Sequence, residues 1–263
     1  MSDKSIEKRG LSAASLKWVA VVTMLADHSA ASLLDRHLMF TPDVGLGEAL
    51  QQAALALHCI GRLAFPLFIF LLVEGFFHTH SRGRYLGRLV LFALISELPF
   101  DLALFLWRSD IQANIWWRME YQNVFFTLAI GFATMWAIER LRPKEQDLIP
   151  AAIRILACIA VVAAACLLAH GIRSDYSWGG VLAIVMGYLA RLCGMRRLEI
   201  IAILVPLVFL SPYELFALLD YPLCAFYDGR KGETVGKWFF YLFYPGHLLI
   251  LGILRVLFVL PPA

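Results

Sequence analysis

Lys17 and His28 are eleven residues apart in one apolar segment. A lysine can bind an anionic ligand through its charge, and a histidine can act on such a ligand as an acid or a base. At about 100° per residue, this spacing places them within about 20° of one helix face and about 16 Å apart along the axis. Lys17 would stand at one end of the helix, and His28, whose imidazole titrates near physiological pH, just past its middle. Asp27 points about 100° away from His28, so we expect it to contact another helix or a cation.

Further ionisable side chains lie inside apolar segments: Glu74, Glu97, Asp101, Asp220 and His247. A charge at the middle of a spanning helix costs about 2.5–3.5 kcal/mol on insertion scales, so these groups are expected to face one another or water. Such a set favours a functional site. The competing interpretation is that individual members only hold helices together.

Glu97 and Asp101 are two carboxylates four residues apart, a spacing at which they repel on a helix. We therefore expect one of them to be protonated, or both to meet a cation, and Arg62 is the predicted partner. These three residues would form a layer in the outer half of the membrane. A second layer of ion pairs, nearer the inner face, is predicted to consist of Glu74, Lys17 and Arg88. Polar side chains expected beside these layers are Asn123, Tyr244 and His247.

The composition predicts an all-α, polytopic integral membrane bundle that forms one domain over residues 1–263. Apolar residues make up 60% of the chain and charged residues 16%, with a mean hydropathy of +0.72. In soluble domains, apolar residues make up about 45–50% of the chain and charged residues about 25%. A net charge of +3 gives no reason to expect a nucleic-acid partner. The five cysteines form no CxxC pair, so no disulfide framework is predicted. His78 and His80 form an HxH pair but lack further nearby ligands, so no metal site is predicted either.

The apolar segments predict about nine transmembrane helices, each of which needs roughly 20 residues. Their predicted ranges are 16–35, 59–77, 85–107, 121–138, 149–170, 176–190, 198–210, 213–226 and 237–260. The stretch 46–58, apolar on one side only, is predicted as an interfacial helix. Segments 198–210 and 213–226 are short, so two spans and one re-entrant pair both stay open.

The distribution of basic residues predicts that the N-terminus is cytoplasmic and the C-terminus periplasmic. Of the 23 Lys and Arg, 15 lie in segments that this orientation places inside and six in segments that it places outside. The inside residues form five groups of three: Lys4, Lys8, Arg9; Arg82, Arg84, Arg88; Arg140, Arg142, Lys144; Arg191, Arg196, Arg197; Arg230, Lys231, Lys237. The outside residues are Arg36, Arg62, Arg108, Arg118, Arg173 and Arg255.

Several stretches resemble the TraX family of bacterial membrane proteins, whose prototype acetylates the N-terminus of conjugative F-type pilin. The similarity runs nearly end to end. The matching stretches are LKWVAVVTMLADHSA, GRLAFPLFIFLLVEGFFHT, YLGRLVLFALISELPFDLA, QNVFFTLAIG, DYSWGG, YDGRKG and YLFYPGHLLIL. The first segment is also similar, more distantly, to acyltransferase-three-type membrane acyltransferases, which carry a basic residue, ten residues and a His. Here Lys17 replaces the more usual Arg of that pattern and loses its bidentate anion recognition.

The resemblance implies a multi-pass acetyltransferase of the bacterial inner membrane, surrounded by lipid, that takes acetyl from cytoplasmic acetyl-CoA. The implied acceptor is the N-terminal amine of a pilin subunit at the outer half of the membrane. His28 suits the general base, with His247 as the other candidate. The residues assigned to catalysis are His28, Asp27, Glu97 and Asp101. Those assigned to binding acetyl-CoA are Lys17, Arg62, Glu74, Arg88, Asn123, Tyr244 and His247.

Two other functions stay open on the sequence. The same catalytic residues could O-acetylate a cell-surface glycan, because the acceptor lies outside the matching motifs. A proton-coupled transporter could use the buried carboxylates as a proton relay, although no inverted repeat is evident. In the acetyltransferase hypothesis, Lys17 and Arg88 bind the phosphates of CoA. Arg62, Asn123 or Tyr244 would stabilise the oxyanion.

Overall fold

The computed structural model describes residues 10–40, 44–113, 120–143, 150–233 and 236–259, and every named element within them is a helix. Only two isolated β-bridges occur in this part of the chain, so the predicted all-α class is confirmed there. Several cations used to predict orientation lie outside the described residues: Lys4, Lys8, Arg9, Arg118 and Lys144.

The helices are α1 (Ala13–Ser29), η1 (Ala30–Leu34), α2 (Asp35–Phe40), α3 (Val44–Gly61), α4 (Ala64–His78), α5 (Arg82–Leu104), α6 (Arg108–Gln112), α7 (Val124–Leu141), α8 (Ala151–Gly171), α9 (Ser177–Leu192), η2 (Arg196–Leu198), α10 (Glu199–Leu210), η3 (Pro212–Leu219), α11 (Asp220–Ala225), α12 (Lys237–Leu254) and η4 (Arg255–Val259).

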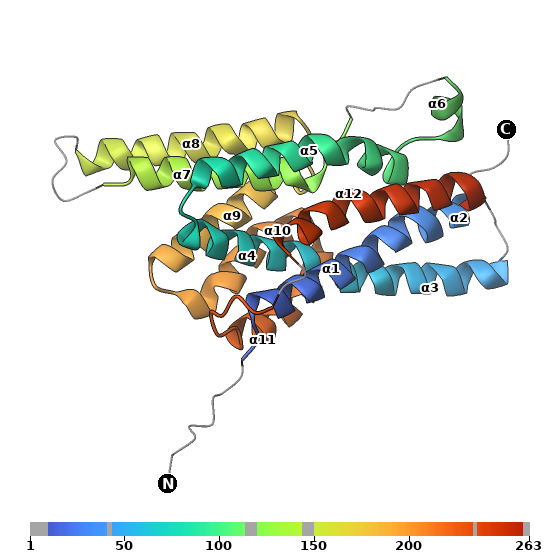
Figure 1. Cartoon of the computed structure of the whole chain (residues 1–263), viewed down its shortest axis with the longest axis horizontal. Coiled ribbons are helices and arrows are strands. Elements are labelled where there is room, and N and C mark those ends of the chain that lie inside the picture. Colours follow the sequence, from blue (N-terminus) through green and yellow to red (C-terminus); the bar gives the residue numbers. More distant parts are fainter. Residues whose placement is uncertain (1–9, 41–43, 114–119, 144–149, 234–235, 260–263) are drawn as a thin grey trace, which may run out of the picture.

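The first helical segment continues from α1 through η1 into α2, and α3 returns beside it (Figure 1). Ser12 caps α1 by accepting a hydrogen bond from the Ser15 amide at 3.2 Å. The loop 227–232 also closes on this end of α1, because the Ala13 amide donates to the Arg230 carbonyl at 2.9 Å. The start of α1 is therefore fixed by its own cap and by the chain segment that precedes α12.

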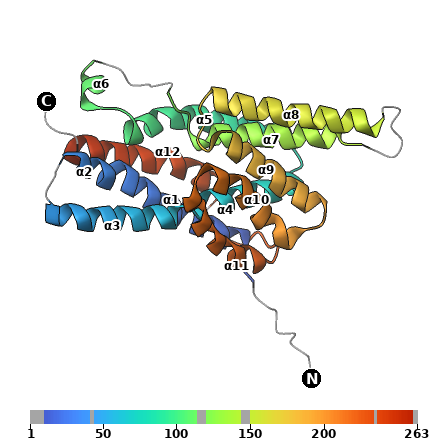
Figure 2. The ribbon, with the colours of Figure 1, turned by 180° about the vertical axis from the view of Figure 1, so that it is seen from behind.

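Helices pack in pairs around a common apolar core, and the pairs include both successive helices and helices far apart in the chain. Contacts join α12 to α5, α7 to α8 and α9 to α10, and Figures 1 and 2 show α7 and α8 side by side from both directions. Fully buried rings and aliphatic side chains of α4, α7 and α9 form the centre of this core, among them Phe70, Phe76, Phe132, Ile184 and Tyr188.

Among the residues that the structure describes, four helices are long and apolar enough to cross a membrane: Leu46–His78, Val124–Leu141, Ala151–Gly171 and Trp238–Val259. The first of these stretches runs across α3 and α4, which a turn at residues 62–63 separates. The predicted helix over 46–58 lies within α3, and its place at the membrane interface stays a prediction. In the Ala151–Gly171 span only 6% of the window is buried, which leaves most of α8 free to contact lipid. The full set of nine spans and the orientation of the termini stay predictions.

The segment 213–226 is not one α-helix in the structure. It folds as η3, an eight-residue 3₁₀-helix, followed by the six-residue α11. Neither element reaches the roughly 17 residues that a span requires. Of the two alternatives, these lengths favour a re-entrant segment after α10, which itself has 12 residues.

Candidate functional site

Two histidines from opposite ends of the chain meet at the centre of the site. His28 on α1 and His247 on α12 are joined by a hydrogen bond of 2.7 Å between Nδ1 of His28 and Nε2 of His247. The ring of Tyr244, one turn before His247 on α12, lies edge-on to His28 with centroids 6.0 Å apart. The structure thus brings Tyr244 and His247 of the last long helix next to His28 of the first.

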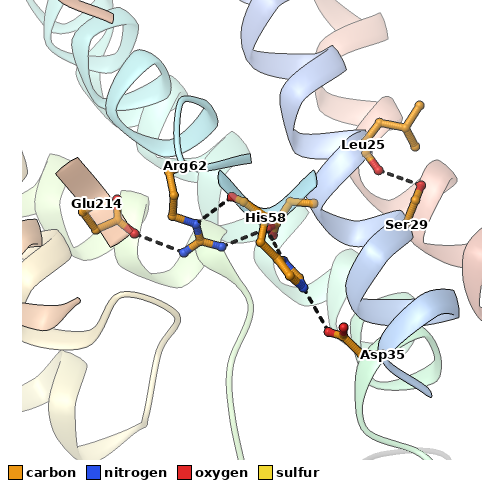
Figure 3. Close-up of polar contacts among 7 residues, drawn as sticks. Leu25, Ser29, Asp35, His58, Arg62 and Glu214 are labelled. Atoms are coloured by element: carbon orange, nitrogen blue, oxygen red, sulfur yellow. Dashed lines mark hydrogen bonds and ion pairs between the residues drawn. The ribbon is translucent and has the colours of Figure 1, made fainter. Parts of the chain in front are cut away.

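Asp27 belongs to a charged network that crosses four helical segments. Figure 3 labels its other members, Asp35, His58, Arg62 and Glu214. The Oδ1 atom of Asp27 accepts hydrogen bonds from Arg62 Nη2 and from His58 Nδ1, both at 2.8 Å. The other nitrogen of His58 contacts Asp35 Oδ2 at 3.0 Å, and Arg62 Nη1 donates to Glu214 Oε1 at 3.1 Å. The expectation that Asp27 contacts another helix and a cation is confirmed.

The predicted pairing of Arg62 with Glu97 and Asp101 is wrong. Arg62 binds Asp27 and Glu214 instead. Glu97 on α5 accepts a hydrogen bond of 2.5 Å from the side-chain amide of Asn123, which also caps α7. Helix period places Glu97 and Asp101 on one face of α5, but it does not determine which neighbouring helix that face contacts.

The predicted pairing of Glu74 with Lys17 and Arg88 is also wrong. Glu74 binds Arg191 of α9 and accepts a hydrogen bond of 2.9 Å from the Tyr227 hydroxyl. Arg191 in turn donates to Glu199 at 2.5 Å. Glu74 is therefore part of a separate ionic cluster that ties α4 to α9 and α10, and it lines neither of the cavities described below.

Gly61 allows α3 to approach α1 closely enough for the Asp27 network to form. A Cβ at this position would overlap the side chain of Asp27. The absence of a side chain at the end of α3 therefore sets the distance from Asp27 to His58 and Arg62.

Gly61→Ala is expected to destabilise the protein by about 1–3 kcal/mol, the usual range for overpacking. Thermal unfolding in detergent would measure the effect. Gly87→Ala is the matched control, because a Cβ at Gly87 in α5 meets nothing within 4 Å and alanine is the better helix former. Equal melting temperatures for the two variants would contradict the predicted close approach.

Two adjoining cavities lie along α1. The first, the His28 cavity, has a volume of about 270 Å³, and its charged or titratable lining side chains are Asp27, His28, Arg62, Asp175 and Glu214. The second, the Lys17 cavity, also has about 270 Å³ and carries Lys17 and Arg88 beside aromatic rings. Both cavities are lined by the same four residues at their junction: Met24, Phe68, Val124 and Tyr244. Lys17 and His28, predicted to share one face of the first helix, thus line two adjoining cavities.

The loop before α9 supplies Asp175 and Tyr176 to the His28 cavity. Tyr176 adopts the left-handed conformation with φ of 58° and stacks on Phe65 with ring centroids 3.7 Å apart. The Thr127 hydroxyl holds the loop by donating to the Asp175 carbonyl. Loss of hydration raises the pKa of Asp175 from 3.8 to about 6, and the nearby Arg62 only partly opposes this effect.

Asp175→Asn is expected to raise the melting temperature, and by more at pH 8 than at pH 4. A carboxyl group whose pKa is raised on folding costs stability only where it is ionised, so the cost develops between about pH 4 and pH 6 and is complete above that range. Asp228→Asn is the control, because hydrogen bonds from Arg230 lower the pKa of the exposed Asp228. If Asp175→Asn raised the melting temperature equally at both pH values, the raised pKa of Asp175 would be contradicted.

Sequence reasoning did not select four residues that the structure places in these networks: His58, Asp175, Arg191 and Glu214. His58 lies in the stretch predicted as an interfacial helix, and Glu214 in the segment predicted either to span the membrane or to re-enter it. The depth of these two side chains in the membrane could therefore not be predicted. Asp175 is part of the stretch DYSWGG, which carried the family resemblance, so that motif was an available signal for it.

The four apolar helices and the charged cavities inside the helical bundle are those of a helical membrane protein with a buried ionisable site. The chain belongs to the TraX family, whose model, described as TraX protein, matches residues 12–255. It is also 31% identical over 258 residues to a probable fimbrial assembly protein FimC, serogroup H1, of Dichelobacter nodosus, covering 91% of this chain and 94% of that protein. No solved structure matches the chain.

Proposed function

We propose that the protein is an acetyltransferase of the bacterial inner membrane that moves acetyl from acetyl-CoA to an amine, most simply the N-terminus of a pilin subunit. The observation that carries the proposal is the pair of adjoining cavities, with cations in one and His28 with carboxylates in the other. A donor and an acceptor could enter such chambers from opposite ends and meet at the junction. Membership of the TraX family and the name of the fimbrial relative support a pilin acceptor.

The Lys17 cavity suits the donor. Lys17 lies 5.3 Å from the ring of Phe240 and Arg88 lies 5.9 Å from that of Tyr241, so both cations stand on aromatic walls. The carbonyl of Lys231 accepts a hydrogen bond from the Ala14 amide, which brings a third basic residue to this end of α1. Phosphates of CoA would bind these cations, and the acyl end would reach the junction.

The His28 cavity suits an amine acceptor. Its lining carries the carboxylates of Asp27, Asp175 and Glu214 and one permanent cation, Arg62, so an ammonium group entering it is attracted. An N-terminal amine has an ordinary pKa of about 7.7–8.0 and must be neutral to attack. A histidine at the cavity wall is the group that can take up its proton.

The transfer requires one bond to form and one to break. The amine nitrogen attacks the thioester carbonyl, the C–N bond forms, and the C–S bond breaks as the thiolate leaves. His28 accepts the proton from the nitrogen and returns it to the sulfur, so atoms and charge balance without a further reactant. Direct transfer in a ternary complex is the simplest scheme, because it needs no cysteine nucleophile.

Of the three residues considered for the oxyanion, Tyr244 is the one with a free donor. Both terminal nitrogens of Arg62 already bind carboxylates, and the amide of Asn123 donates to Glu97 and to the Ala93 carbonyl. The Tyr244 hydroxyl is buried at the junction and has no acceptor among the described residues. We therefore assign the oxyanion to Tyr244.

The proposal is tested with purified protein, acetyl-CoA and a pilin subunit. We expect calorimetry to show binding of acetyl-CoA, and intact-mass spectrometry to show one added acetyl group on the pilin N-terminus. Acetyl-CoA binding with acetyl found only on glycan would support the O-acetyltransferase alternative. Absence of acetyl-CoA binding, with pH-driven substrate flux in vesicles, would support a transporter and overturn the proposal.

Lys17→Gln and Arg88→Gln are each expected to weaken acetyl-CoA binding about tenfold, since one charge-assisted hydrogen bond contributes about 1.5–3 kcal/mol. Their effect should shrink at high salt because the ligand's phosphates are then screened. Arg142→Gln is the control, because the exposed Arg142 pairs with Glu139 on α7 and lines neither cavity. Calorimetry at two salt concentrations measures all three variants, and equal affinities would contradict the assignment of the Lys17 cavity.

A further inference from the structure

We infer that His247 is a positioning residue that holds His28 in one tautomer, with the proton on Nδ1 and the Nε2 lone pair directed to the substrate. The inference rests on the proposed acyl transfer and deepens it by separating the roles of the two histidines. His28 is the general base, and His247 acts through it from a different helix.

The hydrogen-bond chain determines where the protons lie. Nδ1 of His247 contacts the Phe243 carbonyl oxygen at 2.7 Å, and a carbonyl oxygen can only accept. His247 therefore carries its proton on Nδ1, which leaves a lone pair on Nε2 of the neutral ring. The 2.7 Å contact of that Nε2 with His28 then requires His28 to donate from Nδ1. A neutral His28 is left with a free lone pair on Nε2.

The ring geometry supports a directed hydrogen bond. The two imidazole planes are parallel within 3°, and their centroids are 5.0 Å apart while two nitrogens are only 2.7 Å apart. This combination fits rings that meet edge to edge in nearly one plane, as a lone pair in the ring plane requires. Phe243 stacks on His247 with centroids 4.8 Å apart and so helps to keep the plane of that ring.

The surroundings favour the neutral pair over a charged one. Within the described part of the chain, the ion pairs of Asp27 go to His58 and Arg62, and no carboxylate lies within salt-bridge distance of His28 or His247. A buried imidazolium without a counter-ion is costly. His247 also lines neither cavity, so the earlier assignment of His247 to acetyl-CoA binding is not supported by the geometry.

The tautomer is measured directly by ¹⁵N NMR of protein labelled at its seven histidines, with His28→Asn and His247→Gln spectra to assign the two rings. We expect wild-type His28 and His247 both to be protonated at Nδ1 and free at Nε2. A proton on Nε2 of His28, or two protons on His247, would overturn the inference. This readout does not depend on activity, so it separates failure of the inference from failure of the proposed acyl transfer.

Kinetics supply the second readout. His247→Leu, which removes the acceptor, is expected to lower kcat about 10- to 100-fold, as loss of an orienting partner of a functional histidine does in metal sites, without changing KM for acetyl-CoA. His247→Gln keeps an amide oxygen that can accept from His28 and should recover most of the loss. Phe243→Leu removes the stacked ring but keeps the backbone carbonyl, so it should keep the His28 tautomer and at least half of kcat. Equal kcat for wild type and His247→Leu would overturn the inference.

Discussion

Replacing His28 with alanine is expected to lower the rate of acetyl transfer by about 10²–10⁴-fold while leaving acetyl-CoA binding in place. The size follows from the usual contribution of a positioned general base. Binding is expected to persist because the cations assigned to the donor line the other cavity. The measurement is the intact mass of co-expressed pilin, combined with calorimetry of acetyl-CoA on the purified variant.

The control for this variant is His170→Ala. His170 lies on the exposed end of α8, where its Nδ1 contacts the Ser177 hydroxyl at 3.3 Å. We expect wild-type acetylation from it. Equal acetylation by the His28 and His170 variants would exclude His28 as the base, whereas loss of both binding and transfer in His28→Ala would indicate a structural role.

Arg62→Met is expected to give the largest loss of stability, about 3–5 kcal/mol, because breaking a buried ion pair leaves its partner charge uncompensated. Here two carboxylates lose the guanidinium at once, although Asp27 keeps its contact with His58. The side chain of Glu214 is only 2% exposed and that of Asp27 18%, so water cannot replace the guanidinium fully. Thermal and denaturant unfolding in detergent would measure the change.

The test of that mechanism is a triple variant in which Arg62→Met is combined with Asp27→Asn and Glu214→Gln. Neutralising both carboxylates removes the uncompensated charge, so the triple variant is expected to be more stable than Arg62→Met alone. The two remaining side chains keep their shape and can still form neutral hydrogen bonds. If the triple variant were the less stable one, the loss would come from the packing of Arg62 and not from its charge.

The sequence predicted the membrane character, the helical class and the shared helix face of Lys17 and His28 for one physical reason. Apolar composition and helix period are local properties, and they can be read from consecutive residues. The shared helix face of Lys17 and His28 is such a local property, because both residues lie on one helix. The two adjoining cavities follow α1 as that shared face requires.

Partners on different helices could not be predicted in the same way. Helices that are apolar all round give no amphipathic signal for their rotation, and lipid does not distinguish one apolar face from another. Arg62 was therefore assigned to Glu97 on the basis of depth alone, whereas the structure pairs it with Asp27 and Glu214. At Gly61, α3 approaches α1 closely enough for Arg62 to reach Asp27. This approach depends on the distance between two helices, which cannot be read from a pattern of residues in the sequence.

The sequence by itself determined that this chain is a helical TraX-family protein with scarce charges inside its apolar segments. Only the tertiary structure decided which charges meet, that Glu74 belongs to a separate ionic cluster, and that His247 faces His28. The physical reason is that a helix orders its own side chains through its backbone hydrogen bonds. The rotation and depth of one helix against another depend on packing between side chains that are far apart in the chain.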